Sequence, residues 1–265
     1  MTAPVTDTPR RPARGRRLVV VLLVLVGLLV AADFGLAAAG EYQVAQKMRA
    51  KFGLSEDPHV RINGFPFLAQ AVAGDYRDIE ISASGVPVND QLRDLEIKAN
   101  LYHVRIGLSP LLSGDTSDAR IDQVKGTVKI KASDVNRLVN VVTPFTDMSI
   151  EPAELPGFPV SAKQAGVKLG GNTTVAGRKL RITATGVVTL LDGGRVQITT
   201  TDVQLDDTSL GALAEVLGAV RQALSVTVDP GNLPFKVTPT SVKVESGALT
   251  VEGTVNDIPL DQAAF

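Results

Sequence analysis

The chain has 265 residues, of which 44% are hydrophobic and 21% charged, a composition typical of one large globular domain or two small ones. The first 39 residues hold five of its 27 basic and two of its 28 acidic residues, so the remainder has 22 basic and 26 acidic residues. That balance excludes the overall basicity of nucleic-acid-binding proteins, and the absence of cysteine excludes disulfides, thiolate metal sites and cysteine nucleophiles.

The N-terminus has the pattern of a targeting signal. Residues 1–17 are rich in proline and arginine, and residues 18–39 are apolar except for Asp33. Small residues up to Ala39 complete a secretory signal, although the segment is also long enough to span a bilayer uncut. Because positive residues stay in the cytoplasm, we expect residues 41–265 on the outer, periplasmic side of the plasma membrane, in the cell envelope. They would be anchored there or released by cleavage near Ala39.

The rest of the chain is predicted to form mainly strands. A short helix is expected over 41–53, and alternating apolar residues then indicate strands. The predicted strands cover 59–62, 76–83, 92–108, 120–131, 164–170, 173–190, 194–205, 235–245 and 248–255. Amphipathic helices are predicted over 133–142 and from Asp207 or Thr208 onward. The second helix has an apolar stripe, formed by Leu210, Leu213, Leu217, Val220 and Leu224.

The predicted strand 92–108 changes the face that carries its apolar side chains. One phase contains Leu95, Ile97, Ala99 and Leu101, and the other contains Tyr102, Val104, Ile106 and Leu108. Such a change predicts a β-bulge, which bends and twists a long strand. The expected fold is α+β, with a single domain over 41–265 in which a long curved antiparallel sheet wraps around amphipathic helices.

No constellation of residues favours catalysis. The only histidines, His59 and His103, lie in different predicted strands without a metal-binding spacing. Motifs of Rossmann, P-loop and α/β-hydrolase sites are absent. The closest carboxylate pairs lie in a turn and before a helix, where capping and solvation explain them. We therefore expect no enzyme, no metal site and no cofactor. The apolar faces either pack entirely as core or line a groove for acyl chains, whose burial stabilises by about 0.8 kcal/mol per CH₂.

One block of the sequence resembles a known family. Residues 60–70 read VRINGFPFLAQ, and Gly74-Asp75-Tyr76 follows them. Further likeness comes from residues 126–139 and from the LPGFPV segment, 155–160. Over about residues 41–256 the chain resembles the actinobacterial LmeA-type phospholipid-binding proteins.

The resemblance implies a tubular lipid-binding domain, similar to the bactericidal/permeability-increasing protein group. It also implies an envelope protein that binds phospholipid, including phosphatidylinositol and its mannosides, at a membrane surface. In mycobacteria such a protein supports lipomannan elongation, and lipid transfer is a further function open to it. The sequence leaves one alternative, an anchored structural or interaction protein of the envelope with no lipid ligand. An envelope-lipid enzyme has no residue-level support.

The segment from Gly64 to Phe67 is the candidate site. Gly64 permits a sharp turn and Pro66 stiffens it, so two phenylalanine rings form a rigid corner that could close or line one end of an apolar tube. We hypothesise that acyl chains contact this corner and the aliphatic helix faces. The proposed contacts are Phe65, Phe67, Leu68, Val72, Leu138, Val142, Leu213 and Leu217. Core packing is the competing interpretation for each.

Overall fold

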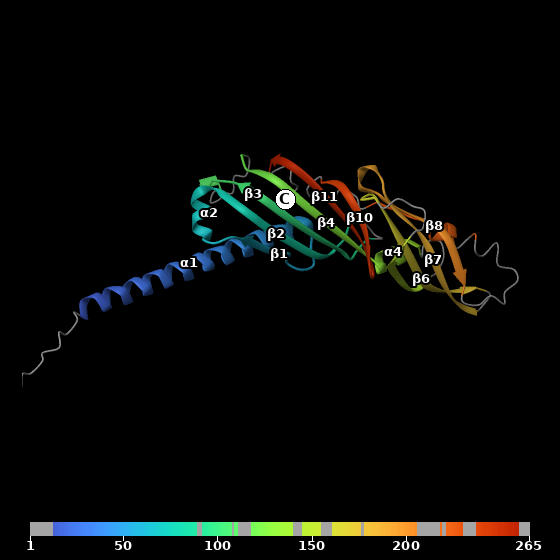
Figure 1. Ribbon diagram of the computed structural model, residues 1–265, viewed down its shortest axis with the longest axis horizontal. Helices are drawn as coiled ribbons and strands as arrows, with labels where there is room; N and C mark the ends of the chain where they lie inside the picture. The colour runs from blue at the N-terminus through green and yellow to red at the C-terminus, as the bar shows by residue number, and fades with distance from the viewer. Residues whose placement is uncertain are drawn as a thin grey trace, which may run out of the picture.

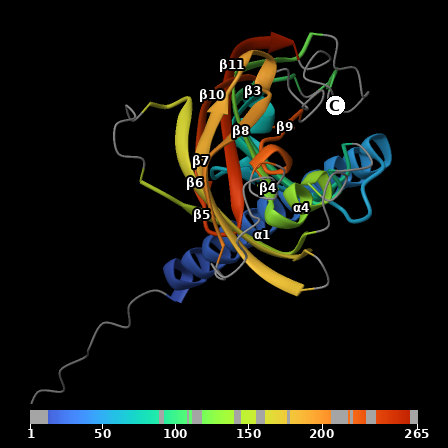
Figure 2. The ribbon, with the colours of Figure 1, turned by 90° about the vertical axis from the view of Figure 1, so that its right-hand side faces the viewer.

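The computed structural model describes residues 13–88, 92–107, 109–110, 118–139, 145–154, 161–175, 178–205, 218, 221–229 and 237–259. These residues form an α+β structure with two antiparallel sheets, where the sequence led us to expect one long sheet (Figure 1). The strand order is β1-β2-β3-β4-β11-β10 in the six-stranded sheet and β5-β6-β7-β8-β9 in the five-stranded sheet. Viewed along the long axis, the strands curl around the interior as half of a barrel (Figure 2).

The elements have the following bounds. The six-stranded sheet contains β1 (His59–Asn63), β2 (Asp75–Val86), β3 (Leu95–Arg105), β4 (Arg120–Lys131), β10 (Thr238–Glu245) and β11 (Ala248–Pro259). The five-stranded sheet contains β5 (Phe145–Pro152), β6 (Gln164–Val175), β7 (Arg178–Leu190), β8 (Val196–Leu205) and β9 (Thr227–Val228). The helices are α1 (Ala13–Phe52), α2 (Phe67–Ala73), α4 (Ala132–Val139) and the 3-10 helix η1 (Asp192–Gly194).

Helix α1 is continuous over 40 residues, about 60 Å at 1.5 Å per residue. The sequence predicts an apolar segment over 18–39 and a separate short helix over 41–53, but the helix continues through Gly40 without a break. Its first half projects away from the sheets with its apolar side chains exposed (Figure 1). Near its other end, Ala45 and Met48 are buried against the six-stranded sheet.

The change of face predicted in residues 92–108 is confirmed, but the bulge predicted with it is wrong. In β3, Leu101 and Val104 are both buried although they are three residues apart. Their partners in β2, Ile79 and Tyr76, are also three residues apart, and β4 has the same spacing. Equal spacing leaves no extra residue in β2, β3 or β4 between these two rows. The six-stranded sheet therefore bends along a row shared by neighbouring strands.

Two clusters of buried side chains fill the interior. The α1 cluster lies between the end of α1 and the inner face of the six-stranded sheet, and includes Val60, Tyr76, Ile81, Leu101, Val104, Ile106, Ile121 and Val124. The inter-sheet cluster joins the two sheets and α4, and includes Leu95, Ile97, Val128, Ile130, Val135, Ile150, Val167, Leu169, Ile182, Val188 and Ile198.

A row of small residues separates the two clusters on the inner face of the six-stranded sheet. Ala99 of β3 pairs with Gly126 of β4, which pairs with Gly253 of β11. Val237 packs onto this row, so that a Cβ at Gly253 would lie 2.7 Å from Val237 Cγ1 and one at Gly126 would lie 3.2 Å from Cγ2. The row therefore has no space for larger side chains.

Other boundaries also differ from the sequence analysis. Strand β5 has no counterpart among the predicted strands, because only Phe145 and Ile150 of its eight residues are buried. Strand β6 continues to Val175, beyond the break predicted after residue 170. The second predicted amphipathic helix lies largely outside the described residues. Within it, residues 221–223 are helical and Leu224 is buried.

Candidate functional site

Helix α2 begins with a capping interaction supplied by α1. The N-cap residue is Pro66, whose side chain cannot accept a hydrogen bond. The carboxylate of Asp33 accepts instead, through Oδ2 from Phe67 N at 2.8 Å and through Oδ1 from Leu68 N at 2.7 Å. Asp33 is only 5% exposed, which strengthens both bonds by excluding water. The single charged residue of the apolar segment therefore holds the start of α2.

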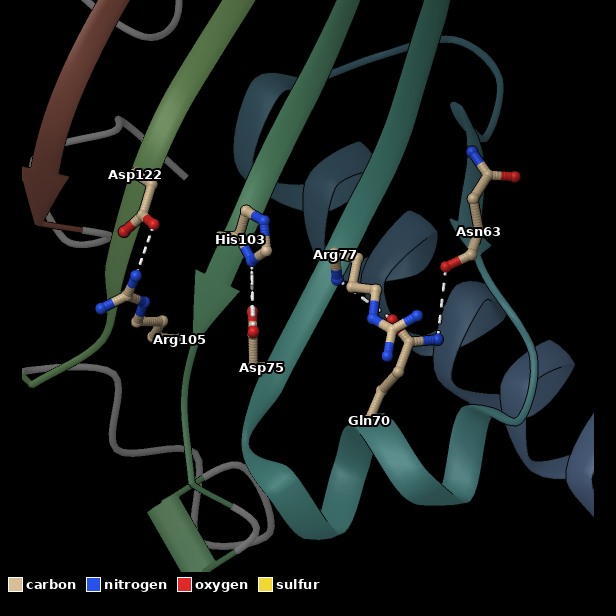
Figure 3. A network of polar contacts seen from close by, with 7 residues as sticks. All are labelled: Asn63, Gln70, Asp75, Arg77, His103, Arg105 and Asp122. Atoms are coloured by element: carbon tan, nitrogen blue, oxygen red, sulfur yellow. Dashed lines mark hydrogen bonds and ion pairs between the residues drawn. The ribbon is translucent and has the colours of Figure 1, made fainter.

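Gln70 holds the turn that precedes α2. Its Nε2 donates to the carbonyl oxygen of Asn63 at 3.3 Å, and its Oε1 accepts from Arg77 N at 3.0 Å (Figure 3). The same Nε2 also donates to the carbonyl oxygen of Gly64, at 2.9 Å. One buried side chain thus joins β1, the turn and β2. Gly64 has φ 101°, and a Cβ there would lie 3.1 Å from Gln70 Nε2, so the turn favours glycine.

The two rings of the aromatic corner face different surroundings. Phe65 is 58% exposed and stacks on Phe34 of α1, with ring centroids 5.8 Å apart. Phe67 is half-buried, packs against the α1 cluster and lies 6.0 Å from the ring of Tyr76. The corner therefore joins the exposed apolar surface of α1 on one side to the buried interior on the other.

Tyr76 places a polar atom among apolar side chains next to α2. The residue is 3% exposed, and its hydroxyl has no hydrogen-bond partner within the described part of the chain. Burial raises the pKa of this phenol above its usual value, so the hydroxyl stays protonated. An unsatisfied buried hydroxyl costs about 1–3 kcal/mol. A ligand with an acceptor oxygen would remove that cost.

Four of the predicted lipid contacts come together in the structure. Phe65, Phe67, Leu68 and Val72 lie in or beside α2, at the end of the six-stranded sheet from which α1 projects (Figure 1). Phe67 and Leu68 are half-buried, whereas Val72 is 78% exposed and Phe65 is largely exposed too. Phe67 and Leu68 are therefore an inner pair, and Phe65 and Val72 are an outer pair.

Leu138, the one other predicted contact among the described residues, does not join this group. Leu138 lies in α4 and packs against the inter-sheet cluster. Strand β4 separates α4 from the α2 end of the sheet, and its 12 residues extend about 40 Å at about 3.3 Å per residue. The other three predicted contacts, Val142, Leu213 and Leu217, lie outside the described residues.

Sequence reasoning did not select Asp33, Gln70 or Tyr76 as site residues. Asp33 was visible as the one charge in an apolar stretch, but its partners lie 34 and 35 residues away. Gln70 and Tyr76 belong to the block that carries the family resemblance. The polarity of Gln70 within the uncharged run 63–74 was the available signal, whereas Tyr76 stands between Asp75 and Arg77 and gave none.

The outer face of the six-stranded sheet is polar at the same end. His103 Nδ1 lies 3.0 Å from Asp75 Oδ1, and Arg105 donates to Asp122 Oδ2 at 2.6 Å (Figure 3). Exposed ion pairs of this kind contribute at most about 1 kcal/mol each. Among the described residues, no group of three or more His, Asp or Glu side chains could hold a metal ion. This face shows the features of a solvated surface.

The interior is tightly packed at the row of small residues between the two clusters. A cavity on the six-stranded sheet, beside Gly126, Val237 and Gly253, has a volume of about 20 Å³. That volume suits one water molecule, whereas ligand pockets usually enclose about 300–1,000 Å³. An acyl chain could enter this cavity only if packed side chains moved apart.

The described residues contain one helix, Gly15–Ala50, that is long and apolar enough to cross a membrane. This helix fits a signal peptide or a membrane anchor, and with the two antiparallel sheets it defines an α+β protein. The sequence model of the LmeA-like phospholipid-binding family matches residues 31–254, most of the chain. The chain therefore belongs to this family, as the resemblance over residues 41–256 predicted. No curated protein and no solved structure matches the chain.

Proposed function

We propose that the protein binds phospholipid on the outer side of the plasma membrane and holds acyl chains against the inner face of its six-stranded sheet. Membership of a phospholipid-binding family over residues 31–254 carries this proposal. The arginines before the apolar helix support the location, because positive flanks stay in the cytoplasm. Phosphatidylinositol and its mannosides are the candidate ligands. Lipid transfer or support of envelope glycolipid assembly, including lipomannan, would be the cellular role.

The acyl chain is proposed to enter between α2 and the sheet. Phe67 and Leu68 are half-buried there, and α2 contains no charged residue. Gln70 and Ala71 are its only buried residues, so moving α2 outward disturbs less packing than moving a strand would. The hydroxyl of Tyr76 would then donate to an ester carbonyl of the lipid. This pairing would satisfy the donor that the lipid-free protein leaves buried.

Native mass spectrometry of the full chain, purified in mild detergent and followed by lipid extraction, tests the proposal. We expect phospholipid at a stoichiometric level in the wild type and several-fold less in Tyr76→Phe. The variant removes an unpartnered hydroxyl, so its stability without lipid should be unchanged or higher. Tyr102→Phe is the matched control, since Tyr102 is half-buried on the same sheet and lies under Lys125. Equal lipid content in Tyr76→Phe and the wild type would contradict the assigned role of Tyr76.

The alternative is an anchored interaction protein of the envelope, with no lipid ligand. The tight packing around the 20 Å³ cavity favours it. A lipid-free mass that persists after incubation with vesicles of phosphatidylinositol and phosphatidylethanolamine would support this alternative. A persistent lipid-free mass would also contradict phospholipid binding as a whole. A normal lipid content in Tyr76→Phe would contradict only the lipid site assigned beside Tyr76.

A further inference from the structure

The apolar segment of α1 contacts the folded domain, although a signal peptide removed by cleavage would have no role in the folded protein. Asp33 caps α2 through two backbone N–H groups, and Phe34 stacks on Phe65. Both residues precede Ala39, so cleavage there would remove both contacts. The N-cap residue Pro66 offers no replacement acceptor. The first turn of α2 would then lose its capping group.

The predicted cleavage point lies within regular structure in the folded protein. Residues 37–40 lie inside the continuous helix α1 and not in a loop. Proteolytic cuts concentrate at exposed loops and chain ends, where the backbone is not held in regular structure. The family match begins at residue 31 and so includes Asp33 and Phe34. The helix and its docking contacts therefore belong to one structural unit.

The end of the domain that docks on α1 presents an apolar surface to the outside. Phe34, Phe65 and Val72 are 62%, 58% and 78% exposed. Residues 63–74 contain no charged side chain. This surface continues the exposed apolar side chains that cover α1 from Leu18 onward. Exposed apolar area of this extent, joined to a helix of membrane length, marks a surface that contacts lipid.

The length of helix α1 determines how deep this apolar surface lies in the bilayer. From Leu18 to Asp33 the helix rises about 22 Å, whereas the hydrocarbon core of a bilayer is about 30 Å thick. With Arg17 at the inner boundary, Asp33 and the start of α2 lie within or next to the outer edge of the hydrocarbon layer. A carboxylate at that depth must be buried and hydrogen-bonded within the protein. Asp33 meets both conditions.

We infer that α1 is retained as a membrane anchor and that Phe34, Phe65 and Val72 form a docking surface for the outer leaflet of the bilayer that α1 crosses. Asp33 then fixes the angle between the anchor and α2, so the domain stands on the membrane in one orientation. The inference does not depend on phospholipid filling the interior. It assigns the apolar surface to the bilayer whether or not an acyl chain enters beside Tyr76.

The intact mass of the protein from the membrane fraction of producing cells tests retention. We expect a mass that includes residues 18–39 and protein that leaves the membrane only with detergent. A mature chain that starts at residue 40 and remains soluble would overturn the inference. Neither readout depends on lipid content, so failure of the proposed lipid site would not change this result.

Fluorescence quenching tests the docking surface. The chain has no cysteine, so Val72→Cys in the full chain can carry one environment-sensitive dye. The control is Thr174→Cys, exposed in the five-stranded sheet. In vesicles of equal parts phosphatidylethanolamine and phosphatidylglycerol, acyl-chain-brominated lipid should quench position 72 at least about threefold more than position 174, because interfacial residues reach the acyl boundary. Equal quenching at the two positions would overturn the proposed orientation.

Discussion

The ring of Phe67 lies 6.0 Å from the ring of Tyr76, with the two planes tilted by 41°. This contact joins the first residue of α2 to the second residue of β2. Together with the Asp33 cap and the Gln70 bonds, it is one of three attachments that hold a short helix with few buried residues. The position of α2 therefore depends on a few separable interactions, and each can be removed singly.

Replacing Phe67 by alanine should lower the free energy of unfolding by about 2 kcal/mol, less than the 3–5 kcal/mol typical of fully buried phenylalanine, because the ring is half-buried. Chemical denaturation in detergent measures the loss. Phe65→Ala is the matched control and should cost less, since Phe65 is largely exposed and stacks on Phe34 at the surface. If Phe67→Ala lowers stability but leaves the phospholipid content unchanged, Phe67 is a core residue and not a lipid contact.

Asp33→Ala should weaken the start of α2 by about 1 kcal/mol, as expected when an N-cap acceptor is lost. The amide hydrogens of Phe67 and Leu68, which donate to the carboxylate, should exchange with solvent several-fold faster. Hydrogen exchange of the full chain in detergent micelles measures this effect. Glu56→Ala, an exposed carboxylate beyond the end of α1, serves as control. Unchanged exchange at both amides would show that Asp33 does not cap α2.

Gln70→Met keeps the size of the side chain but removes three hydrogen bonds. The carbonyls of Asn63 and Gly64 and the amide of Arg77 would lose their partner, so we expect destabilisation of about 2 kcal/mol. Gln204→Met removes an exposed side-chain bond to Asp202 and should change stability very little. Similar free energies of unfolding for the two variants would contradict the role assigned to Gln70.

The β10–β11 hairpin should become less stable in acid. The hydrogen bond from Lys243, at 2.6 Å, lowers the pKa of Glu252 below its usual value, burial opposes this shift, and the hydroxyl of Ser241 adds to it. A lowered folded-state pKa gives stability that is present above the unfolded pKa of about 4.3 and is lost as the pH falls through the folded value. Both side chains are partly exposed, so the pair contributes less than about 1 kcal/mol.

Lys243→Met provides the measurement for this pair. The difference in unfolding free energy between wild type and variant should be largest near neutral pH. It should shrink as the pH falls below the unfolded pKa of about 4.3 and through the lowered pKa of Glu252. A difference in unfolding free energy that stays constant from neutral to acid pH would show that the ion pair of Lys243 and Glu252 does not contribute to it.

The parts of the fold that sequence predicts are those where local pattern determines structure. Strand β4 occurs over the predicted residues 120–131, because Val124, Val128 and Ile130 lie in one phase and neither glycine nor proline stands at its ends. The β10–β11 hairpin follows from the turn at Ser246-Gly247, where Gly247 has φ 83°. The change of face near Leu101 was also visible as a break in periodicity. Each of these signals lies within about ten residues of the structure that it predicts.

The parts that sequence did not predict depend on distant contacts. Strand β5 carries little alternation and is held by pairing with β6. The split into two sheets depends on strand order, which hydrophobic periodicity does not encode. The candidate site shows the same contrast between features with a local sequence signal and features that depend on distant contacts. The corner at Phe65 and Phe67 was predicted from local composition, whereas the cap from Asp33 required the docking of α1.

The row of small residues formed by Ala99, Gly126 and Gly253 also limits how far an acyl chain could reach along the inner face of the six-stranded sheet. Between the level of Ile121, at the α2 end of the inner face, and the level of Gly126, strand β4 advances five residues, about 17 Å. Beyond that level Val237 closes the face against Gly253. One leaflet of a bilayer has a hydrocarbon depth of about 15 Å, half of the full core. If α2 moves outward as proposed, the space opened over these five residues would accommodate an acyl chain of ordinary length and exclude a much longer one.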